Sequence, residues 1–218
     1  MRFKSAALRL VFVLIAVLVV PACQQAYYNA WEKLGKDKRD LLADRVEEAR
    51  ESQEEAKEQF ENALEQFRSV VAFDGGELEN AYDDVKTAYD RSAARATDVT
   101  ERIDDVERVA SDLFAEWDDE LDDYESADLR RRSADQLRET RRRFDGLLAA
   151  MRRAEVSMNP VLERLEDQTL FLKHNLNARA IASLEGEVAV LQDETASLIR
   201  EMERAIREAD DFLDGMNG

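Results

Sequence analysis

Few residues in this 218-residue chain could carry out chemistry. It contains one cysteine, Cys23, and one histidine, His174. These counts exclude an intrachain disulfide, a zinc site built from several cysteines or histidines, and a catalytic pair of histidines. The phosphate-binding pattern G-x-x-x-x-G-K and the catalytic patterns G-x-S-x-G and H-E-x-x-H are absent from the sequence. We therefore expect no catalytic, cofactor-binding or metal-ligating residue, and we expect that the protein is not an enzyme.

Cys23 directly follows a segment that is typical of secretion signals. Three basic residues near the start precede an uninterrupted apolar run over 10–20, which is shorter than the roughly 20 residues of a membrane-spanning helix. The sequence Val-Pro-Ala-Cys resembles a bacterial lipoprotein signal, in which a small residue precedes the acylated cysteine, although Pro21 departs from the usual small or aliphatic residue. We expect 1–22 to be removed and Cys23 to be lipidated. The alternative is a buried cysteine beside an uncleaved anchor.

The residue after the cysteine bears on the location of the protein. In lipoproteins of this type an aspartate at that place commonly retains the protein at the inner membrane, whereas this chain has Gln24. The resemblance therefore implies an outer-membrane anchor with the body, 23–218, in the periplasm, while the inner membrane stays open as an alternative. Two or more acyl chains suffice for stable anchoring.

From residue 42 onwards the apolar residues recur at alternating spacings of four and three. This period predicts helices that pack knobs into holes, and the chain has only 7 Gly and 2 Pro to make turns. Further apolar residues such as Leu64, Val109 and Ile199 widen the stripe, which favours a bundle over a two-stranded coil. We expect an all-α, elongated antiparallel bundle of about four long helices, with two separate hairpins as the alternative. The predicted helices cover approximately 27–73, 77–124, 127–173 and 177–214.

Polar turns separate these four segments. The first combines glycines that can end a helix with an acidic residue that can cap the next one, and Ser126 can cap the third helix. The first and last turns should meet at the membrane-distal end, where they form our candidate interaction tip: Asp74, Gly75, Gly76, Lys173, His174, Asn175 and Asn177. Pro160 lies inside the third segment, and since the heptad phase continues through it we favour one kinked helix over a break.

The charges of the chain are distributed unevenly. The formal net charge is -18, which disfavours nucleic-acid binding. Basic residues nevertheless crowd the start of the third segment, where they oppose the helix dipole and need a partner. The acidic end of the second segment can provide it, and such pairing would set the register of the two helices. The alternative is that Arg130, Arg131 and Arg132 contact anionic head groups or peptidoglycan, since arginine suits phosphate and carboxylate groups.

Several sequence blocks are more specific than heptads alone. The stretches at 32–40, 44–50, 73–76, 171–178 and 181–184 resemble the uncharacterised bacterial DUF2959 family over nearly all of the mature chain. That family has no established activity, so the resemblance implies a helical envelope protein and transfers no catalytic residue. Our hypothesis is a lipid-anchored coiled-coil protein that serves as a structural or interaction element of the envelope, with an unidentified protein partner and no cofactor, and oligomers are possible. The alternative is a helical regulatory subunit of an envelope enzyme or transporter.

Overall fold

A computed structural model of the chain describes residues 37–72, 78–175, 177, 181 and 183–217. The chain divides into two units, Met1–Leu41 and Leu42–Gly218. The first unit contributes only its last five residues, 37–41, to the described part, and the second contains the packed helices. The expected signal over 1–22, the lipidation site Cys23 and the glycine turn at 74–76 lie outside the described residues.

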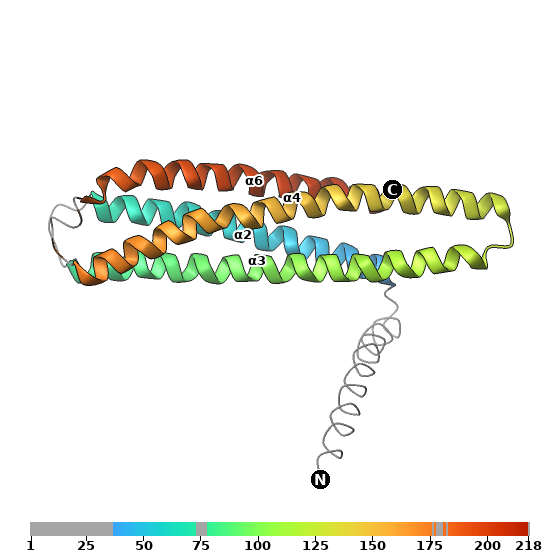
Figure 1. Cartoon of the computed structure of the whole chain (residues 1–218), viewed down its shortest axis with the longest axis horizontal. Helices are drawn as coiled ribbons and strands as arrows, with labels where there is room; N and C mark the ends of the chain where they lie inside the picture. Colours follow the sequence, from blue (N-terminus) through green and yellow to red (C-terminus); the bar gives the residue numbers. More distant parts are fainter. Residues whose placement is uncertain (1–36, 73–77, 176, 178–180, 182, 218) are drawn as a thin grey trace, which may run out of the picture. The chain divides into compact units, whose positions relative to one another are not determined.

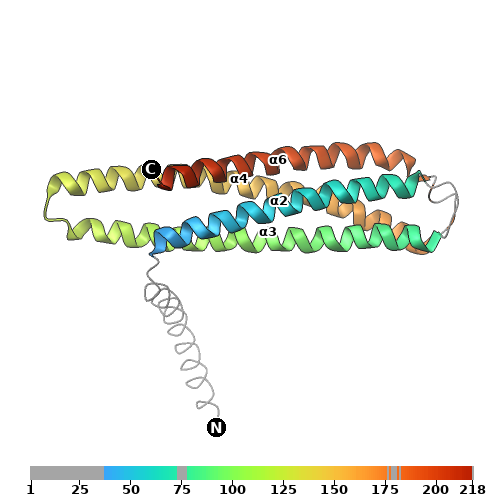
Figure 2. The ribbon, with the colours of Figure 1, turned by 180° about the vertical axis from the view of Figure 1, so that it is seen from behind.

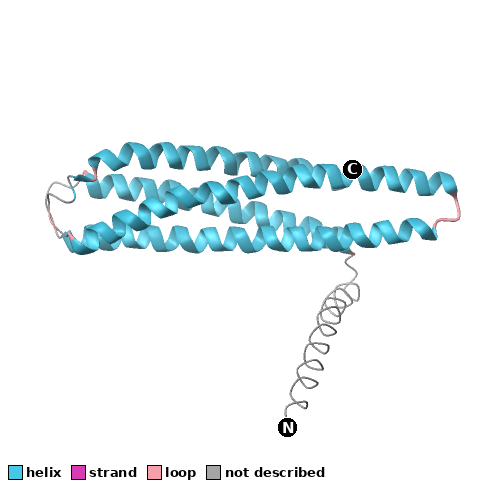
Figure 3. Cartoon of the chain, viewed as in Figure 1, coloured by secondary structure: helices cyan, strands magenta, loops and turns pink. Residues whose placement is uncertain are grey.

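The described residues form long helices joined by short connections (Figure 3). The elements are α2 (Lys38–Val71), α3 (Leu78–Glu120), the short 3-10 helix η1 (Leu121–Asp123), α4 (Ala127–His174) and α6 (Glu185–Asn217). No strand occurs in this part of the chain. The predicted all-α fold of about four long helices is therefore confirmed.

Local chemistry explains how α4 begins and why it continues through its proline. Ser126 accepts a hydrogen bond from the Leu129 backbone N–H at 3.4 Å, which confirms Ser126 as the predicted cap. Pro160 lies within the continuous helix, so the third predicted segment does not break there. A proline cannot donate to the carbonyl four residues earlier, but Val156 and Pro160 are both exposed, and water can satisfy that carbonyl.

The four long helices pack around one core. α4 packs against α3 and α6, and α2 lies beside the same two helices on the other side (Figures 1 and 2). Contacts from Glu55 to Arg95 and from Arg50 to Asp210 join α2 to α3 and to α6. The helices therefore form one four-helix bundle rather than two separate hairpins.

The heptad seams form the core of this bundle. Phe60, Val99, Leu165 and Met202, one from each long helix, are completely shielded from solvent. Three polar residues share the core with them: Gln53, Ser92 and Thr195. Leu113 and Trp117, which continue the predicted seam toward the end of α3, are only half-buried.

An aromatic layer lies near the C-terminal end of α6. The Phe144 ring meets the Phe114 ring at 5.5 Å and the Phe212 ring at 5.9 Å, both edge to face. Past this layer α3 and α4 continue beyond the end of α6 and join through η1 (Figures 1 and 2). We call residues 115–143 the α3·α4 hairpin.

Candidate functional site

The α3·α4 hairpin carries the three arginines that the sequence singles out. Arg130 pairs with Asp122 across the connection. Arg131 and Arg132 pair with Asp128 of their own helix, at 2.9 and 3.0 Å. All three side chains are exposed, yet each already has a carboxylate partner, and the hairpin contains more acidic than basic residues. This arrangement favours local pairing over contact with an anionic surface.

Pairing between the two blocks of charge is sparser than the sequence suggests. Besides Arg130, Arg141 of α4 also contacts the acidic end of α3. It donates a hydrogen bond to the Phe114 carbonyl at 2.7 Å and lies 3.9 Å from Asp118. Its guanidinium also lies 5.6 Å from the centre of the Phe114 ring. Other arginines of this stretch pair within α4, as Arg138 does with Asp135. An acidic residue three positions before each such arginine is visible in the sequence and would have indicated these local pairs.

The described half of the candidate interaction tip lies at the end of α4. Lys173, His174, Asn175 and Asn177 are all exposed. The Asn175 backbone N–H donates to the Phe171 and Leu172 carbonyls, and its side-chain amide donates to the Phe171 carbonyl at 3.0 Å. Asn175 therefore ends the helix. Asp74, Gly75 and Gly76 lie outside the described residues, so the predicted meeting of the two turns stays a prediction.

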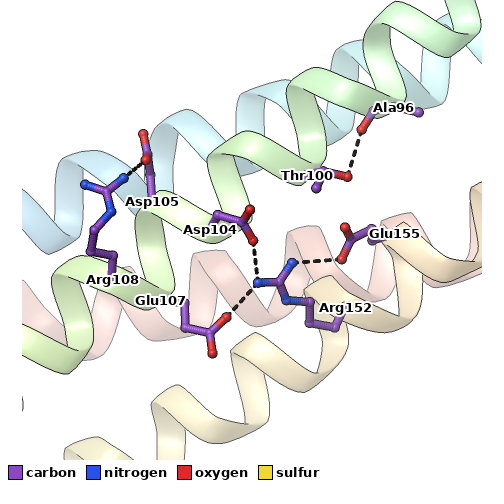
Figure 4. A network of polar contacts seen from close by, with 8 residues as sticks. All are labelled: Ala96, Thr100, Asp104, Asp105, Glu107, Arg108, Arg152 and Glu155. Carbon is purple, nitrogen blue, oxygen red and sulfur yellow. Dashed lines mark hydrogen bonds and ion pairs between the residues drawn. The ribbon is translucent and has the colours of Figure 1, made fainter. Parts of the chain in front are cut away.

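Arginine-carboxylate clusters bridge the seams between helices. Figure 4 shows Arg152 of α4 between Asp104 and Glu107 of α3, at 2.6 Å from each, with Glu155 of its own helix at 3.0 Å. Burial alone would lower the pKa of Arg152, but the hydrogen bonds to these three carboxylates outweigh it and raise the pKa. The guanidinium therefore stays charged and fixes the register of α3 on α4.

Similar clusters occupy the two seams that involve α6. Arg164 of α4 contacts Glu187 and Glu194, each at 2.7 Å, and the hydrogen bond to Glu194 is the main cause that raises its pKa. On the other side Arg50 of α2 lies 2.6 Å from Glu47 and 3.5 Å from Asp210. The hydrogen bond from Arg50 lowers the pKa of the Glu47 carboxyl, against the opposing effect of burial.

The seam between α2 and α3 has ion pairs along only part of its length. Arg102 pairs with Glu48 at 2.9 Å, and one heptad further along α2 Glu55 pairs with Arg95 at 2.6 Å. The next heptad contains a groove with a volume of about 540 Å³ instead. We call it the α2·α3 groove, and its lining is Gln59, Asn62, Ala63, Glu65, Gln66, Ser69, Asp84, Thr87, Ala88 and Arg91. The heptad pattern did not predict this groove, although the change from charged to amide residues at a fixed heptad position is visible in the sequence.

Two further kinds of site are absent from the described ranges. No group of three or more histidine, cysteine, aspartate or glutamate side chains is placed to hold a metal ion in that part of the chain. Among the same residues, no helix is both long enough and apolar enough to cross a membrane.

Comparison with known proteins gives one match. A family model described as a protein of unknown function, DUF2959, matches residues 27–216. No curated protein and no solved structure matches the chain.

Proposed function

We propose, from the premise that this chain belongs to the DUF2959 family, that it is a lipid-anchored helical protein which serves as a structural or interaction element of the bacterial envelope and catalyses no reaction. One observation carries the structural part of this proposal. Each of the four seams is bridged by at least one arginine-carboxylate pair: Glu55 with Arg95, Asp104 with Arg152, Arg164 with Glu194, and Arg50 with Asp210. The charged side chains thus hold helices in register, a task that suits a tethered rod.

The anchoring part of the proposal rests on the sequence. Cys23 follows a basic and then apolar leader, which is the arrangement of a lipoprotein signal. Acyl chains on Cys23 would hold the bundle at the membrane surface. Gln24 favours the outer membrane, with the bundle in the periplasm.

Metabolic labelling with palmitate tests the anchor. We expect the wild-type protein to incorporate label and Cys23→Ser to incorporate none, because Cys23 is the only thiol in the chain. As a matched variant, Gln24→Asp should keep the label but move to the inner-membrane fraction. Equal labelling of wild type and Cys23→Ser would overturn the lipoprotein assignment.

Photo-crosslinking in cells tests the interaction part. A photoreactive residue is placed at Asn175, at the end of α4, or at Tyr124, in the α3·α4 hairpin, since both side chains are exposed. We expect a photoreactive residue at one of these two positions to crosslink a discrete partner, and a photoreactive residue at the other position to crosslink none. A stoichiometric envelope enzyme or transporter as that partner would instead favour a regulatory subunit. Absence of any discrete adduct from both positions would count against an interaction role.

A further inference from the structure

The α2·α3 groove exists because a periodic pattern of ion pairs stops. On α2 the residues that face α3 at intervals of seven are Glu48, Glu55 and Asn62. The corresponding residues on α3, also seven apart, are Arg102, Arg95 and Ala88. The third position thus replaces glutamate by an amide and arginine by a methyl group. The groove lies at this third position, where no such ion pair bridges the described residues of α2 and α3.

The polar groups of this groove are largely free to bind a ligand. Gln59 donates a long hydrogen bond of 3.5 Å to Ser92. Within the described part of the chain, the other polar side chains that line the groove make no hydrogen bond or ion pair; they are Asn62, Glu65, Gln66, Ser69, Asp84, Thr87 and Arg91. The arginines that face the other seams are, by contrast, engaged with carboxylates. The volume of about 540 Å³ lies in the range of roughly 300–1,000 Å³ that is usual for ligand sites.

The chemistry of the lining selects among classes of ligand. An amphipathic helix requires an apolar groove, and a polyproline segment requires an aromatic one, whereas only Ala63 and Ala88 are apolar among the lining residues. A sugar or nucleobase would lack an aromatic face on which to stack, because no lining residue is aromatic. The amides of Gln59, Asn62 and Gln66 each present a donor and an acceptor, which is what a peptide backbone needs.

The charged residues of the lining, which are Arg91 and Asp84 on α3 and Glu65 on α2, restrict the ligand further. Arg91 and Asp84 lie seven residues apart on α3, so their backbones are separated by about 10 Å at 1.5 Å per residue. An extended chain covers a similar length in about three residues. Arg91 would attract an acidic side chain at one end, and Asp84 would attract a basic side chain at the other.

We propose that the α2·α3 groove binds a short extended peptide segment in which an acidic and a basic side chain lie about three residues apart. This inference deepens the proposed function, since it names the surface and the class of partner. Its test uses purified protein and peptide, so it can fail while lipidation of Cys23 stands, and it can succeed if lipidation fails.

The test uses the side-chain amide signals of the isotope-labelled full chain, purified in detergent and observed by NMR. The probe is the acetylated, amidated tetrapeptide Glu-Ala-Ala-Lys, and Gln-Ala-Ala-Gln serves as its uncharged counterpart. We expect the amide signals of Gln59, Asn62 and Gln66 to shift when the charged peptide is added. The signal of Gln136, which lies exposed on the α3·α4 hairpin, should not change. The uncharged peptide should require at least a tenfold higher concentration for the same shift.

A double variant places an ion pair in the groove, and urea denaturation checks that its fold is kept, because Ala88 is only 6% exposed. Asn62→Glu with Ala88→Arg continues the ion-pair pattern of Glu55 and Arg95, and should abolish the peptide-dependent shifts of Gln59 and Gln66 while helicity and stability are kept. A matched variant, Glu48→Asn with Arg102→Ala, removes an ion pair two heptads away and should bind the peptide like the wild type. Unchanged binding by the filled variant, or no shift in the wild type, would overturn the proposal. A response to an N-acetylglucosamine trimer and not to the peptide would also overturn it, in favour of a saccharide.

Discussion

Arg164 of α4 holds Glu194 of α6 at two points. Its Nε lies 2.7 Å from Oε2 and its Nη2 lies 2.8 Å from Oε1. Both side chains are about three-quarters buried, at 27% and 24% exposure. A two-point contact of this kind depends on the planar fork of arginine, which lysine does not have.

We therefore expect Arg164→Lys to lower the free energy of unfolding by about 1 kcal/mol. Arg153→Lys is the matched control, because Arg153 makes a single 3.6 Å contact with Glu201 and is half exposed. The control should change the free energy by less than about 0.5 kcal/mol. Urea denaturation followed by circular dichroism measures both, and equal losses would contradict a role for the two-point geometry.

Replacement of Gln53 by an apolar residue should stabilise the bundle. Gln53 is completely buried, and neither atom of its amide has a hydrogen-bond partner. Burying such a group without a partner costs about 1–3 kcal/mol. Gln53→Met keeps the length of the side chain, and we expect it to raise the free energy of unfolding by about 1–2 kcal/mol. Gln136→Met, at an exposed site on α4, should have little effect. A loss of stability in Gln53→Met would show that the amide is satisfied by bound water.

Pro160 is a second residue that we expect to lower the free energy of unfolding. It lies inside α4 on an exposed surface, and in a helix interior proline is about 3 kcal/mol less favourable than alanine. We expect Pro160→Ala to raise the free energy of unfolding by roughly 1–3 kcal/mol, measured by the shift of the denaturation midpoint. The neighbouring change Asn159→Ala should gain at most about 0.7 kcal/mol. A Pro160→Ala variant that gains no more than this control would contradict the expectation.

Tyr89 makes the stability of the bundle sensitive to alkaline pH. Burial raises the pKa of its phenol above the ordinary value of 10.0, and the nearby carboxylates of Glu166 and Asp90 raise it further. Since the folded state holds this proton more tightly than the unfolded state, Tyr89 stabilises the fold below about pH 10, and this contribution is lost as the pH rises through the folded pKa.

The ionisation can be followed by absorbance at 295 nm. The difference between the titrations of wild type and Tyr89→Phe isolates this one phenol, and its midpoint should lie above pH 10. In concentrated urea the midpoint of the difference curve should return toward the ordinary value. A midpoint that is the same in the folded and unfolded protein would refute the shift.

The fold could be predicted from the sequence because its main determinant is periodic. Val46, Ile103, Leu147 and Leu198 belong to the predicted seams and are all fully buried. Ser126 could be predicted as a cap from its place before an acidic first turn. The heptad pattern determines which face of a helix is buried. It does not determine which helices are neighbours or which residues form ion pairs between them.

The surfaces were harder to predict for the same reason. Arg152 reaches carboxylates about 45 residues away along the chain, and the partner of such a residue depends on the register of two helices. The α2·α3 groove likewise follows from an offset between α2 and α3 that only the packed structure provides. For the arginines at the start of α4, proximity in sequence determined most of the partners, whereas the charge blocks had favoured pairing across the turn.

The layer of Phe114, Phe144 and Phe212 has a mechanical consequence for a tethered protein. On one side of it each long helix is held by two neighbours, and on the other side, among the residues that the structure describes, α3 and α4 contact only each other and η1. Regions with fewer buried contacts open with a smaller free energy than the rest of a domain. A force applied at the turn would therefore separate the ends of α3 and α4 first, and the three interlocked rings would stop the separation from spreading into the bundle. Under force, the α3·α4 hairpin would therefore deform more easily than the four-helix part of the bundle.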